Sequence, residues 1–367
     1  MRRARWIAPW KDSEKKPAIY HCISRVVDRR FVFGDEEREQ FRTLMRMYEN
    51  FTGCRVLSYC IMSNHIHILL EVPPMPKGGI SDEELLRRLS SIYSDAVVGE
   101  VAEELAVARE KDLAEQVAAI HERYTYRMHN LSQFMKTVMQ RMTQWFNRQH
   151  QRTGTLWEER FKSVIVESGI AARMMAAYID LNPVRAGMVK DPAEYRWSSY
   201  GEAVGGGRKG YGKKAREGLV RACMSHKGVG FEAGKWKDVA KMYRTLLGMA
   251  LARKAEGAEK SVSAVKVKRL NAVTSAAMKK RAKPDVNDIK QDKNNTLLPE
   301  MIMAQMLGHR IRYFTAGAVI GSKMFVNEAF SRGRERFSAR RKDGARVMKG
   351  AAKAARCYLW SIRDLKA

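Results

Sequence analysis

The chain has 367 residues, 45% of them hydrophobic, with a formal net charge of +28 and a sequence pI near 10.0. This length and apolar content allow a large core with additions, or two domains, and exclude disorder throughout. The five cysteines form no CxxC pair, and no stretch approaches the ~20 apolar residues of a membrane span. A disulfide scaffold, a structural zinc site and membrane insertion are therefore disfavoured, and a cytoplasmic, nucleoid-associated protein is expected.

The positive charge is concentrated in the second part of the sequence. Residues 1–200 carry 30 Lys and Arg against 26 Asp and Glu, whereas residues 201–367 carry 38 against 14. A polyanion, above all nucleic acid, is the partner that this excess predicts. A solubilising basic surface or a ribosomal-type tail is the alternative.

The first elements in chain order are a strand, a helix and a strand hairpin. Ala18–Arg25 is short and rich in β-compatible residues, and Asp35 opens a helical pattern that ends at Gly53. Residues 55–62 and 65–72 then form two strand-like runs separated only by Ser63 and Asn64, which is a hairpin spacing.

A charged, Ala- and Glu-rich stretch follows, from residue 80 to about 128, and predicts an insertion at about 75–130 in the form of a helical hairpin. Asn130 then caps an apolar-striped helix, residues 164–167 form a fourth strand, and residues 170–181 form another helix. Asn182 and Pro183 are expected to begin a further short helix, with Asn182 as its cap.

This order of elements predicts an α+β fold of the ferredoxin-like type. The pattern is strand, helix, two hairpin strands, helix, strand and helix, which is the split β-α-β arrangement with helices packed on a four-stranded antiparallel sheet. We expect this domain to span residues 1–200.

Residues 201–367 are predicted to form a basic, mainly helical accessory region that binds nucleic acid. Its parts are a flexible basic linker with the sequence GGGRKGYGKK, a mainly helical stretch at 211–258 and a weakly patterned stretch at 259–298. Apolar patterning returns at 301–330, where residues 316–330 are compatible with a helix-turn-helix element. The basic run at 332–349 either touches DNA or forms a disordered, solvated tail.

His65 and His67 are the first pair of chemical interest. Residues two apart on a strand point to the same face, so both imidazoles can meet one cation while Ile66 enters the opposite packing layer. Two imidazoles leave coordination positions for water and a phosphate oxygen, which suits catalysis. A pair of hydrogen-bonded core histidines is the alternative.

Tyr178 and Asn182 are four residues apart and therefore share one helix face. A phenol oxygen and an amide carbonyl can then approach the same site. The alternative is a core tyrosine followed by a simple helix cap.

Five sequence blocks occur in the order found in one family, and the chain resembles the HUH single-tyrosine transposases, most closely those associated with repetitive extragenic palindromes (REP). The blocks are YHCISR at 20–25, LSYCIMSNHIHILLEV at 57–72, WFNRQHQRTGTLWEERFKSVIVE at 145–167, YIDLNPVRAGMV at 178–189 and YRWSSY at 195–200. The insertion and the long extension after residue 200 depart from compact family members without interrupting these blocks.

The resemblance implies that His65 and His67 bind a metal ion, that Tyr178 is the nucleophile and that Asn182 is an additional polar ligand. It further implies strand cleavage and joining on single-stranded, hairpin-forming DNA that contains palindromic repeats, through a 5′-phosphotyrosine. Imidazole and oxygen ligands suit Mn²⁺ and tolerate Mg²⁺. The sequence leaves a monomer and a homodimer equally open.

Further residues are candidates for DNA contacts because aromatic and cationic side chains interleave in polar segments. The alternatives are a core tryptophan and solvated cations. These candidates are Arg29, Arg30, Trp157, Arg160, Lys162 and Arg185.

Two rival functions fit parts of the same pattern. A DNA- or RNA-binding regulator could retain the fold without cleaving. A replication initiator or relaxase is less compatible, because the chain has no GxxxxGK[ST] phosphate-binding loop.

Overall fold

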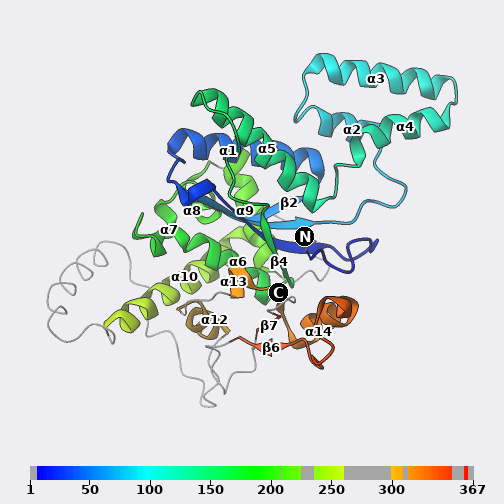
Figure 1. The fold of residues 1–367 in the computed structure, drawn as a ribbon. Coiled ribbons are helices and arrows are strands. Elements are labelled where there is room, and N and C mark those ends of the chain that lie inside the picture. Colours follow the sequence, from blue (N-terminus) through cyan, green and yellow to red (C-terminus); the bar gives the residue numbers. More distant parts are fainter. Residues whose placement is uncertain are drawn as a thin grey trace.

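Four adjacent antiparallel strands form the central part of the structure. The computed structural model describes residues 6–207, 209–224, 235–259, 299–308, 313–348 and 359–362. Within it the strands lie in the order β2-β3-β1-β4 (Figure 1). Their bounds are β1 (Ala18–Arg25), β2 (Arg55–Ile61), β3 (His65–Val72) and β4 (Lys162–Val166). The predicted α+β class and its antiparallel core are confirmed.

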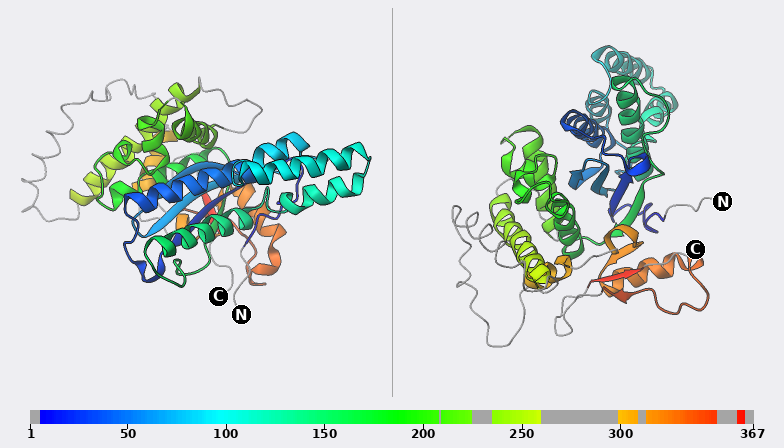
Figure 2. Two further views of the ribbon diagram at one scale, coloured as in Figure 1. Left: turned by 90° about the horizontal axis from the view of Figure 1, so that it is seen from above. Right: turned by 60° about the vertical axis from the view of Figure 1, so that its left-hand side comes forward.

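Helices cover both faces of this sheet (Figure 2). On one face lie α1 (Asp35–Thr52) and α5 (Leu131–Gln149), and on the other lie α6 (Ile170–Asp180) and α9 (Gly210–Cys223). The side chains mark the two faces, since Tyr59 of β2 lies under Arg46 of α1, whereas Glu71 of β3 pairs with Arg221 of α9. Strand alternation thus decides which side chains meet which helices.

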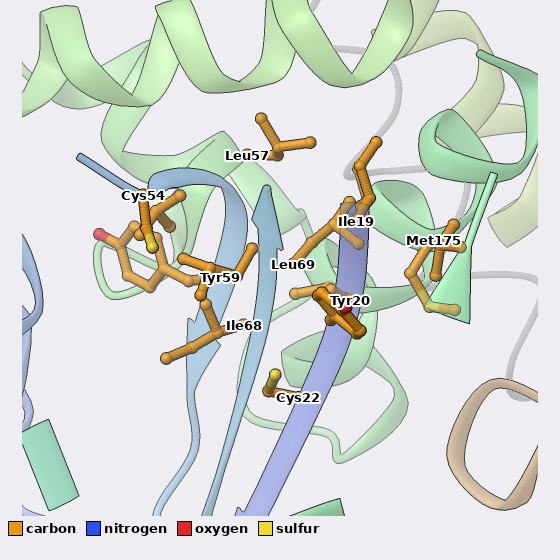
Figure 3. Close-up of a cluster of buried hydrophobic side chains, with 14 of the residues drawn as sticks. Ile19, Tyr20, Cys22, Cys54, Leu57, Tyr59, Ile68, Leu69 and Met175 are labelled. Atoms are coloured by element: carbon orange, nitrogen blue, oxygen red, sulfur yellow. The ribbon is translucent and has the colours of Figure 1, made fainter. Parts of the chain in front are cut away.

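Apolar side chains from both sheet faces make the core continuous with the helices. Tyr20, Ile66 and Ile68 are fully buried, as their strand positions require. Figure 3 shows part of this packing, with labels on Ile19, Tyr20, Cys22, Cys54, Leu57, Tyr59, Ile68, Leu69 and Met175.

Two glycines are required by the backbone. Gly53 ends α1 with φ +70°, in the left-handed region that favours glycine. Gly218 lets α9 approach β2, because a Cβ atom there would lie 2.4 Å from the carbonyl oxygen of Val56. The close approach at Gly218 packs α9 against the sheet.

The predicted insertion is helical and projects from the body of the molecule (Figure 1). It contains α2 (Asp82–Leu89), α3 (Asp95–Glu110) and α4 (Ala114–Thr125). Asp82 holds the three helices together, because it accepts hydrogen bonds from Arg109 of α3 and His121 of α4. The insertion leaves the sheet intact, so it can vary without altering the strands.

The predicted four strands are only part of a seven-stranded sheet. Strand β5 (Val319–Gly321) pairs in parallel with β4, β7 (Trp360–Ile362) pairs with β5, and β6 (Arg346–Val347) pairs with β7. Residues assigned to the accessory region therefore extend the sheet of the first region. Whether the two regions act as separate functional units stays a prediction.

The helix-turn-helix expected at 316–330 is wrong. Residues Val319–Gly321 pair with β4 as a strand, and Ser322 caps α14 (Lys323–Arg332) by accepting from the backbone N–H of Phe325. All three residues of β5 are buried, and the strand lies between β4 and β7, partners that the local sequence pattern does not show. Of the two alternatives for the basic run, the disordered tail is wrong for residues 332–348, where Phe337 is buried against Phe330 and Trp6.

Most of the predicted linker is helical. Helix α8 (Ser199–Gly205) ends at the first residue of this linker, and α9 begins within the linker at Gly210. Gly206 and Gly212 allow the two helices to pack closely. Helix α10 (Trp236–Glu259) confirms the helical stretch, followed in the described residues by α12 (Pro299–Gly308) and α13 (Tyr313–Ala316). The weakly patterned stretch lies outside the described residues from 260 to 298.

The YRWSSY block covers the free edge of β2. The N–H groups of Ile61 and Tyr59 donate to the Trp197 carbonyl and the Ser199 hydroxyl, and the Tyr195 hydroxyl donates to the Ile61 carbonyl. This block is therefore structural, because it satisfies an edge strand that could otherwise pair with another chain. None of the helices in the described parts of the chain is long and apolar enough to cross a membrane.

Candidate active site

Strand β3 places His65 and His67 on the sheet face that α6 covers. Their ring centroids are 5.0 Å apart with planes at 84°, and Ile66 between them is fully buried on the opposite face. This alternation is the geometry expected from the sequence. His67 is buried, whereas His65 is partly exposed at the end of the strand.

A third histidine, His21 of β1, joins this face. Its Nε2 lies 3.0 Å from Nδ1 of His67, the two rings are stacked with centroids 5.1 Å apart, and its Nδ1 lies 2.7 Å from the carbonyl oxygen of Phe314. Phe314 belongs to α13, so the C-terminal region contacts the site directly.

Burial keeps the three imidazoles neutral. It lowers the pKa of His21 to about 4 and that of His65 to about 4, and for His65 the charge of Arg25 acts in the same direction. Burial also lowers the pKa of His67 well below its ordinary value, helped by repulsion from the neighbouring histidines. Neutral imidazoles are the form that binds a metal ion.

Asn64 fixes the other side of His65. Its Oδ1 lies 2.6 Å from Nδ1 of His65, and its Nδ2 donates to the carbonyl oxygen of Arg29 at 3.0 Å. The turn residue between the hairpin strands therefore links the histidine to the loop after β1.

Helix α6 brings Tyr178 to the histidines. The Tyr178 ring centroid lies 5.9 Å from that of His67 and 6.0 Å from that of His21, both edge to face. Phe314 packs on the tyrosine ring at 4.6 Å, and the guanidinium of Arg185 lies 4.9 Å from it. The predicted nucleophile and the predicted metal ligands thus occupy one site.

The electrostatic influences on Tyr178 oppose one another. Burial raises the pKa of its phenol above the ordinary value, while the positive charges of Arg185 and Arg25 lower it. Burial is the larger effect, so the phenol is protonated near neutral pH. Nucleophilic attack therefore requires removal of the phenol proton.

Asn182 is not the cap of α7 (Asn182–Arg185). Leu181 occupies the cap position, and the Asn182 Nδ2 donates backwards to the carbonyls of Tyr178 and Ile179, at 3.1 and 3.2 Å. The side chain closes the end of α6 because the carbonyls of a last helical turn lack partners. The amide oxygen of Asn182 could therefore serve as a metal ligand.

The donor set fits a divalent cation that retains several external ligands. Both β3 histidines are neutral and stand on one face, and their Nε2 atoms have no hydrogen-bond partner among the described residues. Within the same residues, no group of three or more His, Cys, Asp or Glu side chains could hold a metal ion. Any third protein ligand would therefore be an amide, a carbonyl or a hydroxyl oxygen.

The DNA-contact candidates lie in different environments. Trp157 is buried against Phe33 and Phe41 and donates to the Met139 carbonyl, so the packing alternative holds and base stacking is not available to it. Arg185 is half-buried and donates to the Leu307 carbonyl at 2.7 Å. The remaining candidates are exposed, namely Arg29, Arg30, Arg160 and Lys162, and the last of these pairs with Glu159.

Several residues of this site escaped the sequence reasoning. His21 stands in the YHCISR block and shares a face of β1 with Arg25. Only the strand register, which pairs Ile23 with His67, brings it to the site. Phe31 is 81% exposed beside Arg29 and Arg30. An aromatic residue directly after two arginines was a visible signal for it.

Comparison with known proteins identifies part of the chain. Residues 15–105 match the family model described as transposase, IS200 like, and this segment holds His21, His65 and His67. The resemblance to such transposases is confirmed for this segment, which ends before Tyr178.

A solved structure, described as the REP-associated tyrosine transposase bound to a REP hairpin, is similar at a TM-score of 0.35 and 12% identity. The similarity covers 57% of this chain and 88% of that chain. A search of curated proteins found no match.

Proposed function

We propose, from the transposase match at residues 15–105, that this protein cleaves and rejoins single-stranded DNA with Tyr178 as the nucleophile. The observation that carries the proposal is the meeting of Tyr178 with the histidines of the matched segment. The ring centroid of Tyr178 lies within 6.0 Å of those of His21 and His67, although α6 lies outside that segment.

The proposed reaction is a phosphoryl transfer in two balanced steps. The Tyr178 phenol loses its proton as its oxygen bonds to a backbone phosphorus, and the bond from that phosphorus to the 3′ oxygen breaks. The products are a 5′-phosphotyrosine and a 3′-hydroxyl, whose proton balances the one lost by the phenol. A 3′-hydroxyl then attacks the phosphotyrosine and regenerates the phenol. The covalent link conserves the phosphodiester, so no nucleotide cofactor is required.

The residues of the site serve these steps in distinct ways. Arg185 lies over the tyrosine ring and Arg25 adds a second positive charge, so both favour the phenolate that attacks. His65 and His67, with the Asn182 oxygen as a further candidate, would hold Mg²⁺ or Mn²⁺. When bound, such an ion polarises the scissile phosphate and stabilises the leaving oxygen.

The loop after β1 supplies a surface for the strand next to the scissile phosphate. Arg25, Arg29 and Arg30 are exposed and have no ion-pair partner among the described residues. Phe31 is 81% exposed beside them, which is unusual for a large apolar side chain without a partner. Cations for phosphates and an aromatic ring for a base are what single-stranded DNA binding needs.

The backbone conformation of this loop supports the assignment. Asp28 and Arg29 adopt φ of 56° and 55°, a conformation that ordinary residues adopt at a free-energy cost. The loop is nevertheless held, because Asn64 donates to the Arg29 carbonyl and the Phe33 N–H donates to the Ser63 carbonyl. Phe31 is thereby presented outward.

A non-cleaving nucleic-acid regulator remains the second candidate function. Phe314 packs on the Tyr178 ring at 4.6 Å, and burial raises the pKa of the phenol, so the site is covered in this arrangement. The regulator requires the same DNA surface without a covalent step. We also propose a cytoplasmic location, a monomer or homodimer, and a hairpin-forming DNA substrate. The hairpin follows from the motif resemblance.

One incubation separates the two candidates. Labelled single-stranded DNA containing a hairpin is mixed with the full chain, with Mn²⁺, with Mg²⁺ or with EDTA, and resolved by denaturing electrophoresis. The enzyme gives a covalent protein–DNA band only with a divalent ion. Retarded native complexes without any covalent band support the regulator instead.

A further inference from the structure

Asn64 has only one orientation that satisfies both of its partners. The atom that faces the Arg29 carbonyl at 3.0 Å must be the amide nitrogen, because a carbonyl oxygen only accepts. The atom 2.6 Å from Nδ1 of His65 is then the amide oxygen, which also only accepts. The proton of the neutral His65 ring therefore lies on Nδ1, and its Nε2 carries a lone pair.

The same logic runs through His21 to His67. Nδ1 of His21 lies 2.7 Å from the Phe314 carbonyl and so must donate. The ring is fully buried and its hydrogen-bond partners include no carboxylate, so it is neutral and its Nε2 accepts. The atom 3.0 Å away, Nδ1 of His67, must then be the donor. The Nε2 of His67 is again left with a lone pair.

Two separate hydrogen-bond chains thus end in the same tautomer on neighbouring rings. We propose that Asn64 and His21 are positioning residues that hold His65 and His67 with the proton on Nδ1, so that both Nε2 atoms are presented to one divalent cation. The inference rests on the metal site of the proposed function. Partners of this kind set ring orientation and donor strength at metal sites.

The chain that ends on His67 begins in the C-terminal region. Its first member is a main-chain carbonyl of α13, 293 residues away from His21 in sequence. The docking of α13 against β4 and Tyr178 therefore decides which nitrogen of a β3 histidine is free. The C-terminal region participates in the site through backbone geometry, independently of its charge.

The test begins with tautomers in the metal-free, full-length protein. Long-range ¹H–¹⁵N correlation spectra of histidine-labelled protein at pH 7.5 distinguish a proton on Nδ1 from one on Nε2. We expect Nδ1 protons on His21, His65 and His67. A wild-type protein that binds Mn²⁺ but carries Nε2 protons on His65 and His67 overturns the inference.

Variants then connect the tautomers to binding of Mn²⁺, measured by calorimetry. Asn64→Ala, at a partly exposed turn, and His21→Phe should each weaken Mn²⁺ binding about 10- to 100-fold. In each variant the neighbouring ring, His65 or His67 respectively, should no longer carry its proton only on Nδ1. The matched controls are Asn64→Asp and His21→Gln, which restore an accepting oxygen. They should recover most of the affinity. Equal affinities for Asn64→Ala, Asn64→Asp and wild type contradict the inference.

The outcomes also separate this inference from the proposed function. If the spectra show Nδ1 protons on both rings but wild type binds no Mn²⁺, the metal site fails together with the cation-presenting role. If Mn²⁺ binds and the tautomers differ between wild type and Asn64→Ala as expected, the positioning role holds even where no DNA cleavage is found. Should His21→Phe fail to fold, the wild-type spectrum and the Asn64 pair still decide.

Discussion

Tyr178 and the β3 histidines are held in place by ring contacts and hydrogen bonds, and none of these partners is a carboxylate. The tyrosine lies between Phe314 and Arg185, and the two histidines are fixed through Asn64 and His21. The two histidine rings are neutral because burial lowers the pKa of each. Affinity for a cation is therefore not opposed by bound protons near neutral pH.

His67→Ala should abolish metal-dependent cleavage while leaving the affinity for single-stranded DNA within a few-fold of wild type. The reason is that this variant removes one of two imidazole ligands and none of the exposed cations. His121→Ala in the insertion, which loses only a contact to Asp82, is the matched control and should cleave normally. Full Mn²⁺-dependent cleavage by His67→Ala would remove the metal assignment.

Asp180 is predicted to make stability depend on pH. It is fully buried, accepts from the Tyr243 hydroxyl and the Tyr200 N–H, and burial raises its pKa to about 7 from an ordinary value of 3.8. The folded state therefore binds the proton more tightly than the unfolded state. The stability due to this proton is present below pH 4 and is lost as the pH rises through about 7.

Asp180→Asn should remove this dependence because the amide does not titrate. Its oxygen can accept from the Tyr200 N–H, and its nitrogen can donate to the Tyr243 hydroxyl oxygen, the reverse of the direction in wild type. Denaturant unfolding at pH 4.5 and 7.5 measures the wild-type minus variant difference in unfolding free energy. This difference should fall, on the order of 2 kcal/mol, at the higher pH. A difference that is the same at both pH values contradicts the prediction.

At the scale of elements, periodicity predicted most of what local sequence controls. The first and third strands occupy the predicted residues, Gly53 ends α1, and Asn130 caps α5 with its side chain. The strands β5 to β7 were not predicted, because each has two or three residues and depends on partners distant in sequence. The contacts that create a short strand are invisible to a local pattern.

The site was predicted to a similar extent and for a similar reason. Residues on one strand or one helix, such as His65 and His67, have a spacing that fixes a shared face. His21 and Phe314 reach the site only through strand register and the docking of α13. Trp157 was misjudged as a DNA contact because burial depends on α1 and α5, which no spacing in its own segment encodes.

The loop after β1 carries its own prediction. Phe31→Ala should weaken binding of single-stranded DNA about 5- to 150-fold, corresponding to ~1–3 kcal/mol for one stacked base. Thermal stability should be unchanged because the ring is 81% exposed. Tyr126→Ala, which removes an aromatic ring 58% exposed in the insertion, is the control and should bind as wild type does. Identical affinities for the two variants would rule out stacking at Phe31.

At the scale of the whole molecule, the C-terminal region is structural as well as basic. It supplies three strands of the sheet, the Phe314 carbonyl and Tyr243, which bonds to Asp180. Deleting residues 201–367 would therefore disturb the core and the site, so loss of DNA binding after such a deletion would not report on charge. Substitution of exposed cations is the cleaner test.

Within the basic run, some arginines serve the fold and others face solvent. Arg334 and Arg341 donate to nearby backbone carbonyls, whereas Arg340, Lys342 and Arg346 are exposed. Changing the three exposed residues to Gln should reduce the slope of log affinity against log salt by up to about 2, since each phosphate contact contributes ~0.7 on single strands.

The control for this charge test is a variant with the same charge change elsewhere. Lys77, Lys111 and Arg123 in the insertion are exposed, and their change to Gln removes three charges outside the expected DNA surface while the contacts of Asp82 remain. Filter binding between 50 and 300 mM salt compares the two triple variants. Equal slopes in both would show that the basic run does not face DNA.

The central claim is that Tyr178, and no other of the 13 tyrosines, becomes covalently joined to DNA. Tyr178→Phe removes one oxygen and no ring contact, so folding and DNA binding should persist. The decisive measurement is mass spectrometry of nuclease-trimmed adducts formed by wild type with single-stranded DNA and Mn²⁺, alongside the same assay on Tyr178→Phe. The account predicts a nucleotide on the peptide containing Tyr178 and no adduct in the variant. A nucleotide on any other peptide, or undiminished adduct in Tyr178→Phe, would contradict it.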